Sequence, residues 1–145
     1  MKKILFTILL LAAAINAYAY DFSAVCSTGQ TLYYDITSDS TVTVVNPNGG
    51  DYGGWAWRDY TKPTGYMSIP DSVYNNGTSY LVTAVGNNAF WGCSGLSTVI
   101  IPDCINSVGI SAFEDCRQLD SLYIGRNAIL SKYSFGCCHI NKLYH

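Results

Sequence analysis

Acidic and histidine side chains are the first candidates for chemistry in this sequence. Glu114 and Asp115, together with Asp120, could be drawn as the acid and base of a catalytic site. Their surroundings favour a solvated turn instead, and His139 and His145 both lie in the last seven residues. The sequence contains no G-x-S-x-G, H-E-x-x-H, P-loop or G-x-G-x-x-G motif. We therefore expect no catalytic residues and a protein that is not an enzyme.

A metal site is the second kind of chemistry that the residue types suggest. The run Cys137-Cys138-His139 brings three ligand types together near the end of the chain. The paired C-x-x-C spacing that is typical of zinc sites is missing, however. We expect no metal and no other cofactor.

Sugar binding is a third possibility, suggested by an aromatic cluster. Trp55, Trp57 and Tyr60 lie in a Gly-rich stretch, with Tyr52 close by. Because Trp55 and Trp57 alternate, they would share one face of a strand, where exposed rings can stack on sugars. The cluster therefore predicts glycan binding as an alternative function. The other interpretation is that these rings plug the end of a hydrophobic core.

An internal repeat predicts the elements that position these residues. The twelve residues from Val85 to Leu96 match those from Val108 to Leu119 at an offset of 23 residues, with six identities. Within a unit, alternation predicts a short strand with Val99 and Ile101 facing inward, preceded by a short helical turn at Ala89-Phe90. A partial copy precedes these units and includes Met67, Ile69 and Pro70. Another partial copy follows them, with one residue deleted after Phe135. It includes Leu130, Phe135, Cys137, Ile140 and Leu143.

The repeat resembles the BspA-like leucine-rich repeat family, whose unit reads roughly I-G-x-x-A-F-x-x-C-x-x-L-x-x-V-x-I-P-x-x-V. Residues 82–128 match this pattern almost position for position, and residues 63–81 and 129–145 match it in part. The resemblance implies a leucine-rich-repeat solenoid, exposed at the cell surface or secreted. It also implies adhesion or protein–protein recognition, with host extracellular proteins or other cells as partners.

We predict three parts of the chain. Residues 1–19 have the basic start, apolar run and Ala17-Tyr18-Ala19 site of a cleavable signal peptide, so the protein is expected to be exported to the periplasm, cell surface or medium. Residues 20–62 read as a β-rich N-terminal cap. Residues 63–145 hold the repeats, interrupted at about 73–83 by a hairpin centred on Asn76-Gly77. After cleavage no segment that could span a membrane is expected.

Stacking of the units predicts two further features. Cys93, Cys116 and Cys137 fall on one repeat position, where they would form either a ladder of buried thiols or disulfides between neighbouring coils. Outward-facing strand positions would align in two columns on the sheet face, which we predict to bind a protein partner. These columns are Tyr66, Thr98, Ser121 and Lys142, and Ser68, Ile100, Tyr123 and Tyr144.

Composition narrows the set of partners. The chain carries 8 Lys and Arg against 10 Asp and Glu, so it lacks the excess of basic residues that binding to nucleic acid requires. The last repeat strand, near Tyr144, has no evident cap, and an uncovered strand edge favours self-association. A spacer or capping fragment with no ligand of its own is the remaining alternative.

Overall fold

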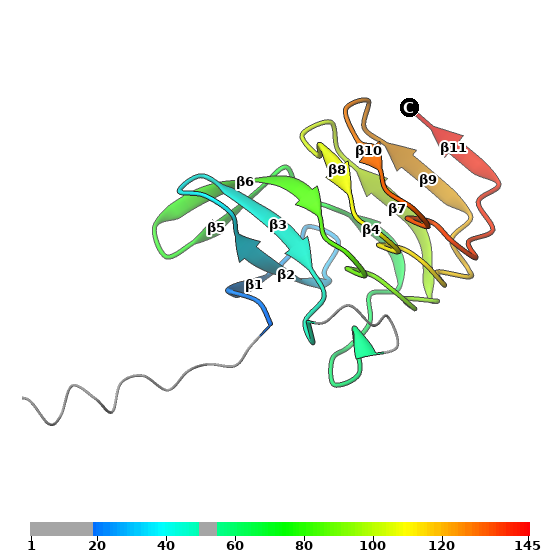
Figure 1. Ribbon diagram of the computed structural model, residues 1–145, viewed down its shortest axis with the longest axis horizontal. Coiled ribbons are helices and arrows are strands. Elements are labelled where there is room, and N and C mark those ends of the chain that lie inside the picture. Colours follow the sequence, from blue (N-terminus) through cyan, green and yellow to red (C-terminus); the bar gives the residue numbers. More distant parts are fainter. Residues whose placement is uncertain (1–18, 50–54) are drawn as a thin grey trace, which may run out of the picture.

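The computed structural model describes residues 19–49 and 55–145 (Figure 1). Residues 1–18 of the predicted signal peptide, and Tyr52 of the aromatic cluster, lie outside the described residues. The described chain forms two β-sheets, one of seven strands and one of four. The described residues form no α-helix, so the predicted helical turn at Ala89-Phe90 is wrong as a helix. This segment and the equivalent Ala112-Phe113 are tight hydrogen-bonded turns.

The seven-stranded sheet begins with three antiparallel strands from the N-terminal region, β1 (Phe22–Val25), β2 (Thr31–Ile36) and β3 (Thr41–Val45). It continues in parallel through β6 (Thr78–Val85), β8 (Ser107–Val108) and β10 (Ile129–Leu130). Strand β5 (Ser72–Asn75) pairs with β6 as the predicted hairpin. Its turn residues Asn76 and Gly77 both have positive φ, 46° and 88°, as an Asn-Gly hairpin turn requires.

The four-stranded sheet is entirely parallel and has the order β11-β9-β7-β4. Its strands are β4 (Gly65–Ser68), β7 (Leu96–Ile101), β9 (Ser121–Ile124) and β11 (Lys142–Tyr144). From β6 onward the chain alternates between the two sheets, so each repeat contributes one strand to each. Figure 1 shows these alternating strands stacked side by side.

Like residues stack on like between the units, and this forms the core. The rings of Phe90 and Phe113 stack at 4.9 Å between centroids, and those of Phe113 and Phe135 at 5.1 Å. Trp57 extends this aromatic column on the other side, 6.2 Å from Phe90. Val99 is fully buried and its paired neighbour Leu122 is 2% exposed, as the inward-facing pattern predicts. Burial of such side chains contributes roughly 1.5–3 kcal/mol each.

In each unit the chain bends at two equivalent positions, where the residue has a left-handed backbone conformation with positive φ. Asn88, Ser111 and Tyr133 have φ between 54° and 59°, and Gly92, Asp115 and Cys137 have φ between 57° and 68°. This backbone conformation is costly for residues other than glycine, so it persists here because the packed units impose it.

The last unit corrects our prediction for the cysteines. Cys138, not Cys137, follows Phe135 in the same hydrogen-bonded turn that links Cys93 to Phe90 and Cys116 to Phe113. The deletion therefore falls before Phe135 rather than after it. Cys137 is exposed and occupies a left-handed bend instead.

Candidate binding surface

The four-stranded sheet brings the eight predicted strand-face residues into two columns, in the predicted order. Tyr66 pairs with Thr98, Thr98 with Ser121, and Ser121 with Lys142. The second column runs from Ser68 through Ile100 and Tyr123 to Tyr144. Parallel pairing of equivalent strands aligns equivalent residues, which is why the repeat register was sufficient to predict the columns.

Tyrosine rings dominate the exposed part of this face. Tyr66 is 51% exposed, and Tyr123 and Tyr144 are exposed by 40% and 42%. The rings of Tyr123 and Tyr144 stack at 4.3 Å with an interplanar angle of 10°. A shallow hollow of about 210 Å³ beside this pair is bounded by His145 and Pro102, among others. The result is a flat aromatic surface with polar neighbours, a type of surface that is common in protein interfaces.

Asp120 links the last two strands of this sheet. Its Oδ1 accepts a hydrogen bond of 2.8 Å from Asn141 Nδ2, and its Oδ2 accepts one of 3.0 Å from Ser121 Oγ and lies 3.4 Å from Lys142 Nζ. These bonds, that from Asn141 above all, lower the pKa of Asp120 below its ordinary value. The predicted face residues Ser121 and Lys142 are therefore partly occupied with this carboxylate.

The predicted tryptophan pair does not form a surface. Trp57 is 3% exposed, and its indole Nε1 donates a 2.9 Å hydrogen bond to the carbonyl of Ala89. Trp55 is 54% exposed and stacks with the guanidinium of Arg58, 4.1 Å from the ring centroid. The expectation that both rings share one exposed face is wrong because residues 55–59 form turns, not a strand. Of the aromatic cluster, Trp57 packs into the core.

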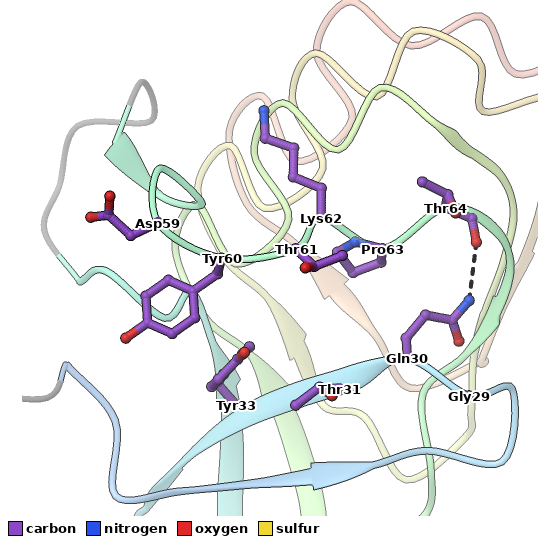
Figure 2. A pocket seen from close by; sticks show the side chains of 10 residues that line it. All are labelled: Gly29, Gln30, Thr31, Tyr33, Asp59, Tyr60, Thr61, Lys62, Pro63 and Thr64. Atoms are coloured by element: carbon purple, nitrogen blue, oxygen red, sulfur yellow. Dashed lines mark hydrogen bonds between the residues drawn. The ribbon is translucent and has the colours of Figure 1, made fainter.

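Tyr60, the third predicted glycan-binding residue, lies in a different setting. It packs edge-on against Tyr33 and Tyr20, at centroid distances of 5.2 Å and 6.3 Å. It lines a groove of about 510 Å³ between the start of β2 and residues 59–64 (Figure 2). Sequence reasoning missed this groove, because its two walls come from separate segments with no shared motif.

The cysteines are all free thiols. Cys116 Sγ donates to the carbonyl of Phe90 at 3.3 Å, and Cys138 Sγ donates to that of Phe113 at 3.1 Å, so each thiol bonds to the preceding unit. Burial raises the pKa of Cys93 to about 12, and the hydrogen bond with Cys138 together with burial raises that of Cys116 as well. The thiols of Cys93 and Cys116 therefore remain protonated at neutral pH and are poor nucleophiles. The hydrogen bond with Cys116 lowers the pKa of Cys138 instead. Within residues 19–49 and 55–145, no group of three His, Cys, Asp or Glu side chains is placed to hold a metal ion.

Solved structures of leucine-rich repeat proteins share this fold. One from Bacteroides capillosus is 23% identical over 85% of this chain and 88% of its own length, with a TM-score of 0.61. One from Bacteroides ovatus is 26% identical over 75% of this chain, with a TM-score of 0.58. A leucine rich cell surface protein from Faecalibacterium prausnitzii is 21% identical over 74% of this chain, with a TM-score of 0.51. The chain spans 24% of the length of each of the last two proteins.

Among curated proteins, none matches this sequence. In the part of the chain that the structure describes, no helix has the length and apolar character needed to span a membrane. The model of the BspA type leucine rich repeat region, which has six copies, matches residues 63–145, the part that forms β4 to β11. Since this match covers more than half of the sequence and agrees with the alternating strands, the chain belongs to the BspA type leucine-rich repeat family.

Proposed function

We propose that this chain is an exported, non-catalytic protein that recognises a protein partner through the outward face of the four-stranded sheet. The observation that carries the proposal is the register of the two columns, which places Ile100, Tyr123 and Tyr144 in one continuous stripe. Tyrosine is favoured at interfaces because it offers a large contact area for little loss of side-chain entropy. The ordered Tyr123–Tyr144 stack lowers that loss further.

Export and an adhesive role are part of the proposal. The signal-like residues 1–19 support export, as does the cell surface description of the Faecalibacterium prausnitzii relative. In this proposal the repeats form a short solenoid, and β1 to β3 with Trp57 cap its first unit. The partner class that fits best is an extracellular protein of a host or of another cell.

The test is adhesion of the purified protein to wells coated with basement-membrane extract. We expect the double variant Tyr123→Ala, Tyr144→Ala to lose at least about tenfold in binding, since truncating an aromatic anchor costs on the order of 1–2 kcal/mol. Tyr74→Ala is the matched control, because Tyr74 is 69% exposed but lies on β5 of the other sheet.

Equal binding by the folded double variant would remove the strand face as the site. Equal losses in the double variant and in Tyr74→Ala would indicate nonspecific adsorption. If the unaltered protein binds the extract no more than it binds an albumin-coated well, the proposal of adhesion to host matrix is wrong.

A further inference from the structure

A groove of about 510 Å³ lies between the start of β2 and residues 59–64. Figure 2 shows its two walls facing each other: Gln30, Thr31 and Tyr33 on one side, and Tyr60, Thr61 and Pro63 on the other. We propose that this groove binds a neutral oligosaccharide. Its volume, about 510 Å³, lies within the range of small-ligand sites.

Hydrogen bonds and ring contacts join the two walls at both ends of the groove. Gln30 Nε2 donates two hydrogen bonds across the groove end, of 3.0 Å to the carbonyl of Thr64 and 2.9 Å to that of Tyr66. At the other end Tyr60 packs against Tyr33, which in turn packs edge-on against buried Trp57 at 5.6 Å. A site that is already in place loses little entropy when it binds.

The wall chemistry matches a sugar, which has hydroxyl edges and apolar C–H faces. The half-buried Tyr60 ring supplies apolar surface, and Pro63, which also lines the groove, is buried. Thr31 and Thr61 are exposed, and within residues 19–49 and 55–145 their hydroxyls make no hydrogen bond to another residue. Two hydroxyls beside an aromatic ring can therefore donate to and accept from the sugar hydroxyls.

The placement of the charged side chains favours a neutral ligand over an ionic one in this groove. The charged lining residues are one acid, Asp59, and one base, Lys62. Lys62 Nζ donates to the carbonyl of Gly92 at 3.0 Å, and Asp59 accepts from Asn48 Nδ2 at 3.3 Å. Figure 2 shows both side chains pointing away from the space between Thr31 and Pro63. Neither a phosphate nor a carboxylate would find a charged partner inside.

This site differs from the tryptophan pair that the sequence suggested, and it does not rest on the strand face. The earlier idea needed Trp57 at the surface, whereas the groove uses the ring of Tyr60 and keeps Trp57 beneath Tyr33 as support. Failure of matrix adhesion and failure of sugar binding are therefore independent results.

The experiment is an NMR titration of the ¹⁵N-labelled protein with maltotriose, cellotriose and N-acetylchitotriose, and with an anionic heparin tetrasaccharide. We expect at least one neutral trisaccharide to bind with a Kd of about 1 mM or tighter and to shift the amide signals of Thr31 and Thr61. The double variant Thr31→Val, Thr61→Val retains the β-branched shape and should weaken binding by about fivefold or more. Tyr60→Ala should weaken it by about tenfold or more.

Tyr74→Ala, outside the groove, should bind as the unaltered protein does. The double valine variant keeps the test valid if Tyr60→Ala loosens the fold, because Thr31 and Thr61 are exposed. Three results would overturn the proposal: no shift with any of the three neutral sugars, binding that the valine variant leaves unchanged, or tighter binding of the heparin fragment to the groove.

Discussion

The two edges of the four-stranded sheet differ in how far other residues cover them. At the β4 edge, the side chain of Gln30 donates to the carbonyls of Thr64 and Tyr66, and Thr28 Oγ1 accepts from the amide of Ser68. At the β11 edge no described strand or side chain hydrogen-bonds to the free side of the strand, and Leu143 is 55% exposed. The first edge is covered by residues outside the repeats, whereas no residue among 19–49 and 55–145 packs over the second.

The exposed fractions of paired residues show the difference between the last unit and the unit before it. Leu122 is 2% exposed and its paired neighbour Leu143 is 55% exposed. Val108 is fully buried and its paired neighbour Leu130 is 48% exposed. Equivalent positions of successive units are thus buried or exposed according to whether a further unit packs over them. Burial here belongs to the stack and not to the single repeat.

The largest expected effect is on Leu122. We expect Leu122→Ala to lower the free energy of unfolding by about 2–5 kcal/mol, because it opens a cavity under a covered unit. The matched change Leu143→Ala should cost under about 1 kcal/mol, since half of that side chain is already in water. Urea unfolding followed by circular dichroism measures both. Equal losses at the two positions would show that β11 is covered in solution.

A smaller effect is expected at the covered edge. Gln30→Ala removes the hydrogen bonds to the carbonyls of Thr64 and Tyr66, and also those that Gln30 Oε1 accepts from Thr28 Oγ1 and Cys26 Sγ. Water can replace the exposed ones in part, so we expect a loss of about 1 kcal/mol. Gln118→Ala is the control, because Gln118 is exposed and makes no hydrogen bond to another described residue. If both variants unfold at the same urea concentration, the side chain of Gln30 does not stabilise this edge.

The smallest effect is a pH dependence confined to β11. Because the folded pKa of Asp120 lies below 3.8, its interactions stabilise β11 above that pH and are lost as the pH falls through the lowered pKa. Amide exchange at Lys142 and Leu143, measured by NMR as the pH is lowered, should accelerate beyond the intrinsic trend there. Asp120→Asn should abolish this acceleration, and the same acceleration in that variant would assign it to another group.

The strand pairing of much of the repeat region could be predicted, because the repeat period determines which residues lie opposite one another. The pairing of Ile100 with Tyr123 and of Tyr123 with Tyr144 follows from the position of each residue within its unit. The hairpin at Asn76-Gly77 was predictable from turn chemistry alone. Where the period breaks, the prediction was wrong: one residue is missing before Phe135, and Cys138 takes the place expected for Cys137.

The β-rich character of residues 20–49 was predictable, but the aromatic segment at residues 55–60 was not, for a different reason. Alternation of Trp55 and Trp57 indicates a shared face only on a strand, and the chain there turns instead, sending one ring inward and the other outward. The groove beside Tyr60 depends on contacts of that residue with Tyr33, far away in sequence. Such long-range contacts leave no periodic signal.

The aromatic column from Trp57 through Phe90 and Phe113 to Phe135 also bears on where the molecule opens locally. Each of the inner rings touches a neighbour on either side, whereas Phe135, in the described chain, stacks on Phe113 alone. Displacing Phe135 breaks one of these ring contacts and displacing Phe113 breaks two, so we expect local opening to begin more readily around Phe135.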